Sequence, residues 1–170
     1  MKIAVFNGSP RKENTYAMVQ AFCEGAEAAG HEVEVYHVGQ MKIAGCLGCG
    51  YCHGKGEGNC IQKDDLEKIM PAYREADMIV FASPIYYFTM TAQMQAAIQR
   101  MYCIWKPLKA KKYALLLSSG SPNVYDGTIA QFEAMMNFSK IDNAGIITAH
   151  GDENKSEEKL NEIREFAKGL

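Results

Sequence analysis

Short apolar runs alternate with stretches of helical periodicity along the whole chain. Five runs have the length and composition of strands, at residues 2–7, 33–38, 77–83, 113–117 and 144–149. The segments between and after them carry apolar residues at the three- and four-residue spacing of amphipathic helices. Because the strand runs are mostly apolar on both faces, the pattern predicts a parallel sheet that helices cover on both sides.

Local signals predict where some of the helices begin and how they run. Asn14 or Thr15 can cap the first helix, since both side chains accept a hydrogen bond from a free backbone N–H group. Pro71 lies inside the second helix and is expected to kink or split it, because proline has no N–H donor. The last helix is expected to start at Asn154, with Glu157 as its capping-box partner.

The first strand is followed by a polar turn, residues 8–15, that leads directly into a helix. In a parallel sheet the carboxyl ends of the strands share one edge, and ligands of open α/β sheets bind there. The hydroxyls of Ser9 and Thr15, the Arg11 guanidinium and the free N–H groups of a helix start suit a phosphate. An ordinary polar turn with a helix cap and a solvated Arg11 explains the segment equally well.

The third and fourth strands are followed by segments of a different kind. Ser83 to Phe88 ends in three consecutive aromatic residues, which are hard to bury because successive side chains point in different directions. Such residues can wall a flat ligand, although for Phe88 alone we favour a hydrophobic cap on the next helix. Residues 118–122 are small and polar and expose their backbone. Three strand ends of this kind at one edge predict a ligand cleft.

Composition and charge narrow the class of protein. With 170 residues, 48% of them hydrophobic and 22% charged, the chain is expected to form one globular domain over residues 1–170. A net charge of −2 offers no electrostatic attraction to nucleic acid or to an anionic membrane, so neither is expected as a partner. The apolar runs are too short for a membrane span or a signal peptide, and we expect a cytoplasmic protein.

Four of the six cysteines fall in one glycine-rich loop, with the spacing Cys46-x2-Cys49-x2-Cys52-x7-Cys60. Four thiolates this close together could hold an iron–sulfur cluster or zinc, because both take four sulfur ligands. The alternative is a loop of reduced thiols that binds no metal. We favour this alternative, because a motif without its structural context is only a hypothesis.

Three segments stand out together: Asn7-Gly8-Ser9-Pro10-Arg11 with Asn14-Thr15, Ser83-Pro84-Ile85-Tyr86, and Asp64-Asp65 after the cysteine loop. They resemble the NADPH-dependent FMN reductase family of flavodoxin-like flavoproteins. The resemblance covers nearly the whole chain, and its motifs come in the expected order on the expected elements. It implies a flavodoxin-like, doubly wound α/β fold, with a five-stranded parallel sheet of order 2-1-3-4-5 and helices on both faces.

The resemblance also implies an FMN site. In that family the first loop holds the FMN phosphate, and the loops after the third and fourth strands line the isoalloxazine ring. By position, the phosphate site of this chain would be Ser9, Arg11, Asn14 and Thr15. The ring site would be Pro84, Ile85, Tyr86, Tyr87, Phe88, Ser119 and Gly120.

The resemblance further implies an activity. We expect an oxidoreductase that binds FMN noncovalently, accepts hydride from NAD(P)H and reduces a small acceptor such as free flavin or a quinone. No catalytic acid or base is assigned, because the flavin carries the chemistry. A homodimer is also implied. Two alternatives remain open: a flavodoxin-like electron carrier, and an iron–sulfur flavoprotein, a related branch with a similar cysteine spacing.

Overall fold

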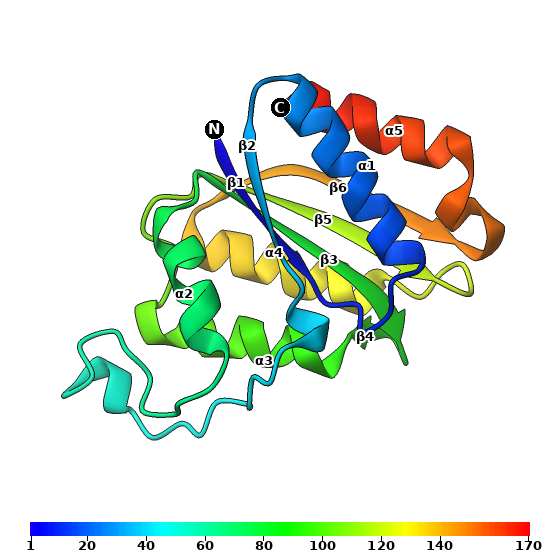
Figure 1. The fold of residues 1–170 in the computed structure, drawn as a ribbon. Helices are drawn as coiled ribbons and strands as arrows, with labels where there is room; N and C mark the ends of the chain where they lie inside the picture. Colours follow the sequence, from blue (N-terminus) through cyan, green and yellow to red (C-terminus); the bar gives the residue numbers. More distant parts are fainter.

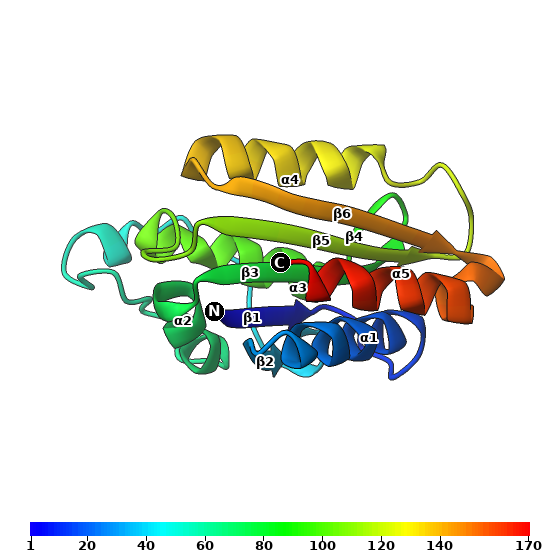
Figure 2. The same ribbon diagram turned by 90° about the horizontal axis from the view of Figure 1, so that it is seen from above.

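A computed structural model describes all 170 residues and shows a parallel sheet with helices on both faces (Figure 1). The long strands lie in the order β2-β1-β3-β5-β6, with β6 and β2 at opposite edges (Figure 2), and every neighbouring pair is parallel. This confirms the order 2-1-3-4-5, since β5 and β6 are the fourth and fifth long strands. The strands are β1 (Lys2–Asn7), β2 (Glu32–Tyr36), β3 (Met78–Tyr86), β5 (Lys112–Ser119) and β6 (Asp142–His150).

Side chains that alternate along the strands build a separate core on each face of the sheet. On one face, Ile3 and Val5 of β1 pack in a buried cluster with α1 (Asn14–Ala28) and α5 (Glu157–Lys168), which lie side by side. On the other face, Ala4 and Phe6 pack with α2 (Leu66–Glu75), α3 (Ala92–Arg100) and α4 (Asp126–Ser139). None of these helices combines the length and apolar character of a membrane span.

The predicted caps of α1 and α5 are wrong. The residue before α1 is Glu13, and no side chain caps the helix. The Thr15 hydroxyl lies 2.6 Å from the Ser118 hydroxyl instead, so it is used in a long-range contact. Helix α5 begins after Ser156, whose Oγ accepts a hydrogen bond from an N–H of the first turn. Asn154 lies before it, buried in the short 3₁₀ helix η4 (Gly151–Lys155).

Pro71 was expected to kink or split α2, and the helix is not split, because it continues from Leu66 to Glu75. Proline removes only the hydrogen bond that its own N–H would donate to the carbonyl of Glu67. Glu67 is exposed, so water can take the place of the missing donor. The buried side chains of Ile69 and Tyr73 hold the helix against the sheet on both sides of the proline.

Strand β3 is longer than predicted and forms a hairpin. It continues through Tyr86, turns at Tyr87 and Phe88, and returns as the two-residue strand β4 (Thr89–Met90). The turn residues have φ angles of 49° and 68°, which only the left-handed region allows. Two-residue hairpin turns with two positive φ angles favour Asn and Gly, so two aromatic residues here are strained.

Candidate functional site

Three loops meet at the carboxyl edge of the sheet and surround a concave site of about 140 Å³. The loops follow β1, β3 and β5, as the sequence predicts for a ligand cleft. Most of the predicted site residues line this cavity: Ser9, Arg11, Asn14, Thr15, Pro84, Ile85, Tyr86, Ser119 and Gly120. Glu13 and Ser118 also line it; they belong to the predicted cleft segments 8–15 and 118–122 but were not among the predicted FMN-site residues.

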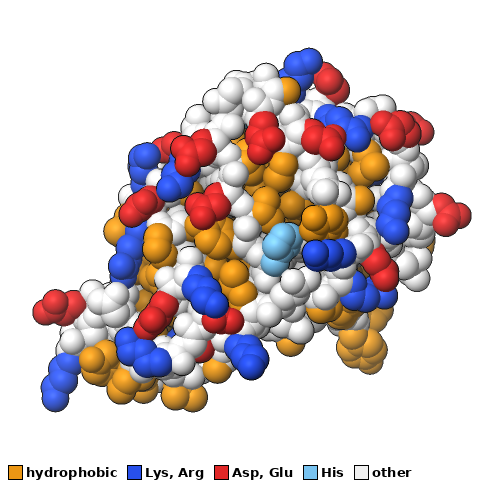
Figure 3. Space-filling view, in the orientation of Figure 1, with side chains coloured by type: hydrophobic (Ala, Val, Ile, Leu, Met, Phe, Trp, Pro, Cys, Tyr) orange, Lys and Arg blue, Asp and Glu red, His pale blue; other side chains and the backbone are white.

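Tyr87 and Phe88, by contrast, do not line the cavity. They form the tip of the β3–β4 hairpin, where Tyr87 is 94% exposed and Phe88 is also exposed. The expected hydrophobic cap formed by Phe88 is therefore wrong. Figure 3 shows the hairpin region as an apolar projection at the lower right of the molecule. The strained turn holds both rings out beside the cavity.

The loop after β1 is folded on itself through Ser9, which is buried. Its hydroxyl donates to the Arg11 carbonyl at 2.8 Å and accepts from the Arg11 N–H at 3.2 Å. Its own N–H donates to the side-chain oxygen of Asn7, the last residue of β1, at 2.9 Å. These bonds fix the loop conformation without any ligand.

A close backbone approach fixes the same loop from below. A Cβ atom added to Gly39 would lie 2.3 Å from the Ser9 carbonyl carbon, so only glycine fits there. On the other side, the Thr91 hydroxyl donates to the Gly8 carbonyl at 2.8 Å and also accepts the Met94 N–H that begins α3. Neither Gly39 nor Thr91 carries a local signal for this role, because both contacts join distant parts of the chain.

The amino end of α1 provides the polar wall of the cavity. Thr15 is buried, and the 2.6 Å contact between its hydroxyl and that of Ser118 joins α1 to the end of β5. The N–H groups of the first turn have no acceptor within the helix, and this end of the helix dipole favours an anion. The cavity therefore has hydroxyls and free N–H groups on one wall.

Arg11 lies at the rim of the cavity, with 60% of its side chain exposed. Its guanidinium forms an ion pair with Glu13, with 3.3 Å between Nη1 and Oε2. Because both side chains are solvated, this pair is weak, and an anion in the cavity can compete with Glu13 for the guanidinium. Arg11 thus lies close to the polar wall, and its only ion pair is the weak one with Glu13.

The loop after β5 is held by Tyr125 and by Asn154, which the sequence singled out only as a helix start. The Ser119 hydroxyl lies 2.6 Å from the Tyr125 hydroxyl, which donates to the Ala149 carbonyl at 2.8 Å. Burial raises the pKa of Tyr125, so it remains a neutral donor. The side-chain amide of Asn154 donates to the Ser119 carbonyl at 2.8 Å. No local pattern reveals these contacts, since they join separate elements.

The cysteine loop forms a second candidate site. It contains one three-residue 3₁₀ helix, η2 (Tyr51–His53), and it faces the 3₁₀ helix η3 (Met101–Ile104) that follows α3. Five thiols line one small cavity here: those of Cys46, Cys49, Cys52 and Cys60, as the motif predicts, and that of Cys103. Cys103 has no place in the motif and was missed.

The thiols of this second site differ in their surroundings. Cys46 and Cys49 are exposed, whereas Cys52 and Cys103 are buried. Burial, together with the neighbouring thiols of Cys52 and Cys60, raises the pKa of Cys103 to about 12. No three His, Cys, Asp or Glu side chains lie in an arrangement that could hold a metal ion as they stand. Both hypotheses for the loop, a metal site and free thiols, therefore stay predictions.

Asp64 and Asp65, part of the family resemblance, fasten the start of the cysteine loop. Asp65 accepts the N–H of Lys42 at 2.8 Å, and Asp64 accepts the N–H of Ala44 at 3.0 Å. Asp64 also pairs with the buried Arg100 guanidinium at 2.9 Å. Burial opposes ionisation of Asp64, but these hydrogen bonds outweigh it and hold its pKa below the ordinary value.

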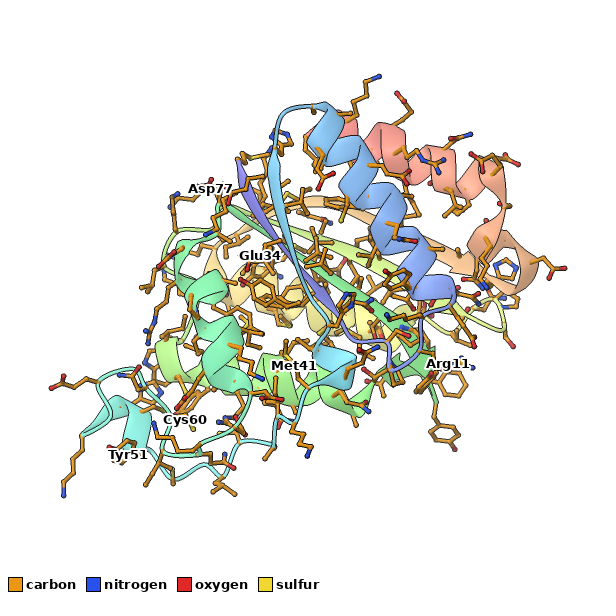
Figure 4. All side chains as sticks on the ribbon, in the orientation of Figure 1. Arg11, Glu34, Met41, Tyr51, Cys60 and Asp77 are labelled. Carbon is orange, nitrogen blue, oxygen red and sulfur yellow. The ribbon has the colours of Figure 1, made fainter.

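The two candidate sites lie at opposite ends of the molecule. Figure 4 shows Cys60 and Tyr51 beside the cysteine loop at one end and Arg11 at the other. The views in Figures 1 and 2 agree on this separation. Within one chain, therefore, the two sites share no residue.

The residues at the sheet edge fit FMN by their chemistry. Hydroxyls, free N–H groups and a nearby guanidinium suit a phosphate, and a cavity floor of Pro84 and Ile85 with the ring of Tyr86 suits a flat apolar ring system. The cysteine site offers the donor atoms of a sulfur-ligated centre without its coordination geometry. Its five thiols line the same cavity as a buried guanidinium whose Nε atom has no partner.

Comparisons with known proteins find relatives that are named iron–sulfur flavoproteins. An iron–sulfur flavoprotein from Archaeoglobus fulgidus is 43% identical over 102 residues, which are 59% of this chain and 46% of that protein. An iron–sulfur flavoprotein from Methanosarcina thermophila is 33% identical over 127 residues, 72% of this chain and 65% of that protein. The chain spans about half the length of several curated relatives that it matches.

Solved structures share the fold at low identity. An FMN-dependent NADH-azoreductase from Bacillus anthracis, in complex with FMN, has a TM-score of 0.76 at 16% identity. The match covers 100% of this chain and 99% of the azoreductase chain. An NAD(P)H:quinone oxidoreductase from Methanothermobacter marburgensis has a TM-score of 0.72 at 19% identity, covering 100% and 96%. The model of the NADPH-dependent FMN reductase family matches residues 1–150, and the chain belongs to this family.

Proposed function

We propose that this chain is an oxidoreductase that binds FMN at the carboxyl edge of its sheet and takes hydride from NAD(P)H to reduce a small acceptor, such as free flavin or a quinone. One observation carries the proposal: the polar wall of α1, the small loop after β5 and the end of β3 line one preformed cavity. Family membership supports it.

The polar wall would hold the phosphate end of the cofactor. The N–H groups at the start of α1 and the Thr15 hydroxyl would donate to phosphate oxygens, and Arg11 would add a charged hydrogen bond from the rim. The Ser9 hydroxyl, which donates its proton to the Arg11 carbonyl, would keep the loop in shape around the phosphate. Asn14 lies in the same wall. Thr15 already shares a hydrogen bond with Ser118, so its orientation is fixed before a ligand binds.

The ring end of the cofactor would lie against Pro84, Ile85 and Tyr86, with the backbone of Ser119 and Gly120 on the far side. Bound FMN supplies the redox chemistry, because its ring system accepts a hydride and passes electrons on. The protein positions the ring, keeps the loops rigid and controls access. Among side chains that line the cavity, only Arg11 and Glu13 are charged, and we assign neither as a catalytic acid or base.

The exposed rings of Tyr87 and Phe88 would form one edge of the acceptor site. They lie next to the cavity without filling it, so a planar nicotinamide or acceptor can stack there in turn. A single open face visited first by the reductant and then by the acceptor predicts ping-pong kinetics.

Steady-state oxidation of NADPH and NADH, with free FMN or a quinone as acceptor, tests the proposal. We expect turnover that depends on the acceptor and parallel double-reciprocal plots. A pure electron carrier would bind FMN with negligible turnover, and that result would favour the flavodoxin-like alternative. Protein that binds no flavin would contradict both.

A second function, one-electron transfer through an iron–sulfur centre, is favoured by a separate observation. The cysteine motif lines one cavity with a buried, incompletely paired guanidinium, and the curated relatives described above are named iron–sulfur flavoproteins. Cys46, Cys49, Cys52 and Cys60 would be the ligands. Absorption spectra with iron and zinc analysis of anaerobically purified protein test this: a cluster adds broad absorbance beneath the flavin bands, and metal-free protein would restore the simpler hypothesis.

A further inference from the structure

Arg100, at the end of α3, is the most deeply buried charged side chain of the molecule. Only 1% of its side chain is exposed, and it lines the same cavity as the five thiols. Burying a guanidinium is costly unless its charge and its N–H groups are satisfied. Because Arg100 is not part of the FMN cavity, its burial needs an explanation at the cysteine site.

The partners of Arg100 account for only part of its donors. Nη1 donates to the Asp64 carboxylate at 2.9 Å and to the Ala44 carbonyl at 2.8 Å, and Nη2 lies 3.4 Å from the other oxygen of Asp64. The Nε–H group has no acceptor, although it is buried. Buried N–H groups are almost always paired, so an unpaired one marks a place for a missing acceptor.

Sulfur atoms are the most numerous side-chain acceptors in the cavity around this donor, which Gln62 also lines. The cavity that Arg100 lines contains five cysteines and no other acidic, basic or histidine side chain. A neutral thiol is a weak acceptor, but a metal-bound thiolate or an inorganic sulfide carries negative charge and accepts a strong hydrogen bond. The unpaired Nε–H is therefore better suited to the loaded site than to the free thiols.

We propose that Arg100 is a positioning and charge-compensating residue of the sulfur site, which donates its Nε–H to a ligand sulfur and makes the bound centre easier to reduce. The proposal rests on the second function above. Reduction adds one electron and thus one negative charge to the centre, so a fixed positive charge beside it favours the reduced state. Hydrogen bonds to sulfur and local charge both set the potentials of iron–sulfur centres.

A purely structural role for Arg100 is the competing explanation, because its bonds to Asp64 and Ala44 also tie the cysteine loop to α3. Two variants separate the roles by sign. Arg100→Gln removes the positive charge, and Asp64→Asn removes the negative charge while it leaves Arg100 in place. Electrostatics predicts opposite shifts of the reduction potential, whereas loosening of the loop predicts shifts in the same direction.

The experiment is a reductive titration with dithionite of anaerobically purified wild type, Arg100→Gln, Arg100→Lys and Asp64→Asn, with iron content measured beside it. We expect a more negative potential for Arg100→Gln, a more positive one for Asp64→Asn, and a small change for Arg100→Lys, which keeps the charge. If Arg100→Gln fails to assemble a centre, the Asp64→Asn shift decides the matter.

Potentials that do not move, or that move in the same direction in Arg100→Gln and Asp64→Asn, would overturn the proposal while the centre itself stands. Wild-type protein without sulfur-bound iron would overturn both the proposal and the second function. In that case the FMN content of the same samples still reports on the sheet-edge site, which shares no residue with the cysteine cavity.

Discussion

The two candidate sites are organised in opposite ways. At the sheet edge, each loop leaves a buried strand and is tied down within a few residues, as Ser9 is by Asn7 and Ser119 is by Tyr125. The cysteine loop is held mainly by side chains from outside it, such as Asp64 and Asp65 at its start and Arg74, which donates to the Gly58 carbonyl. Asp64 and Asp65 hold its first residues, and between them and η2 the chain has no regular secondary structure.

This difference indicates which site has its final conformation before a ligand binds. The sheet-edge cavity has its hydroxyls buried and oriented, so binding there adds contacts to a finished structure. The thiols line one cavity without a coordination geometry, and metal binding by such loops is coupled to their ordering. We therefore expect the flavin site to be independent of the cysteine site, and the cysteine site to depend on what it binds.

The largest effect is expected from Cys52→Ser. If the loop holds a metal centre, removing a ligand weakens a metal-binding free energy that is on the order of 10 kcal/mol for structural zinc. Iron should be lost and the loop should become protease-sensitive, while FMN content stays unchanged. Cys103→Ser is the matched control, since Cys103 lines the cavity outside the motif and should keep its iron. Wild-type protein without bound iron, together with unchanged proteolysis in Cys52→Ser, would support the metal-free hypothesis.

The next effect concerns Gly39, which lies beneath the first loop. In Gly39→Ala the new methyl group would lie 2.3 Å from the Ser9 backbone, so the loop must shift. Overpacking of this kind costs about 1–3 kcal/mol, and FMN binding should weaken with it. Gly54→Ala in the cysteine loop is the control, because nothing lies closer than 4.0 Å to its added methyl group. Equal flavin loss in both variants would mean that the two regions are not independent.

Arg11 gives a smaller and more selective effect. Arg11→Ala should weaken FMN binding by roughly 1.5–3 kcal/mol, the scale of a hydrogen bond to a charged group. Riboflavin binding should change much less, because riboflavin lacks the phosphate. Glu13→Gln is a useful companion, since it frees the guanidinium from its ion pair and should strengthen FMN binding slightly. Equal losses for both flavins in a fluorescence titration would exclude Arg11 as a phosphate ligand.

At the hairpin tip, a substitution that raises the stability of the fold is expected to lower turnover. Replacing Tyr87 and Phe88 by Asn and Gly relieves two left-handed aromatic residues and should raise stability by about 1–2 kcal/mol. If the rings form the acceptor edge, turnover should fall at the same time. Thermal unfolding and acceptor KM, measured on the same variant, check both. A more stable variant with unchanged kinetics would remove Tyr87 and Phe88 from the acceptor site.

Acid pH should loosen the start of the cysteine loop, which Asp64 holds. The folded-state pKa of Asp64 is held below its model-peptide value of 3.8, so its bonds stabilise the fold above that pH and are lost as the pH falls through the folded value. Hydrogen exchange at Ala44 should rise in that range. Asp64→Asn should remove this pH dependence, and an unchanged profile in the variant would assign it to another group.

Sequence reasoning reached the sheet order and most of the sheet-edge cavity because both follow from local patterns. Apolar runs mark the strands, and parallel topology collects the segments after them at one edge. The β3–β4 hairpin was missed because Tyr87 and Phe88 occupy turn positions that normally carry Asn and Gly. No turn signal exists in that segment.

The remaining misses share one physical cause. Ser118, Tyr125 and Asn154 support the cavity through contacts with residues from other elements, and Arg100 and Cys103 reach the cysteine loop from α3 and η3. Only the packed tertiary structure brings such pairs together. Local sequence patterns therefore predict the loops that surround a site, but not the distant residues that hold those loops in place.

A flavin titration of protein stripped of metal tests the central claim most directly. The sheet-edge cavity is complete without the cysteine centre, so iron-free apoprotein should quench FMN fluorescence saturably and in equimolar amount, with clearly weaker quenching of riboflavin. Failure to bind FMN without the metal, or equal affinity for FMN and riboflavin, would contradict a preformed phosphate-binding cradle that is independent of the thiols.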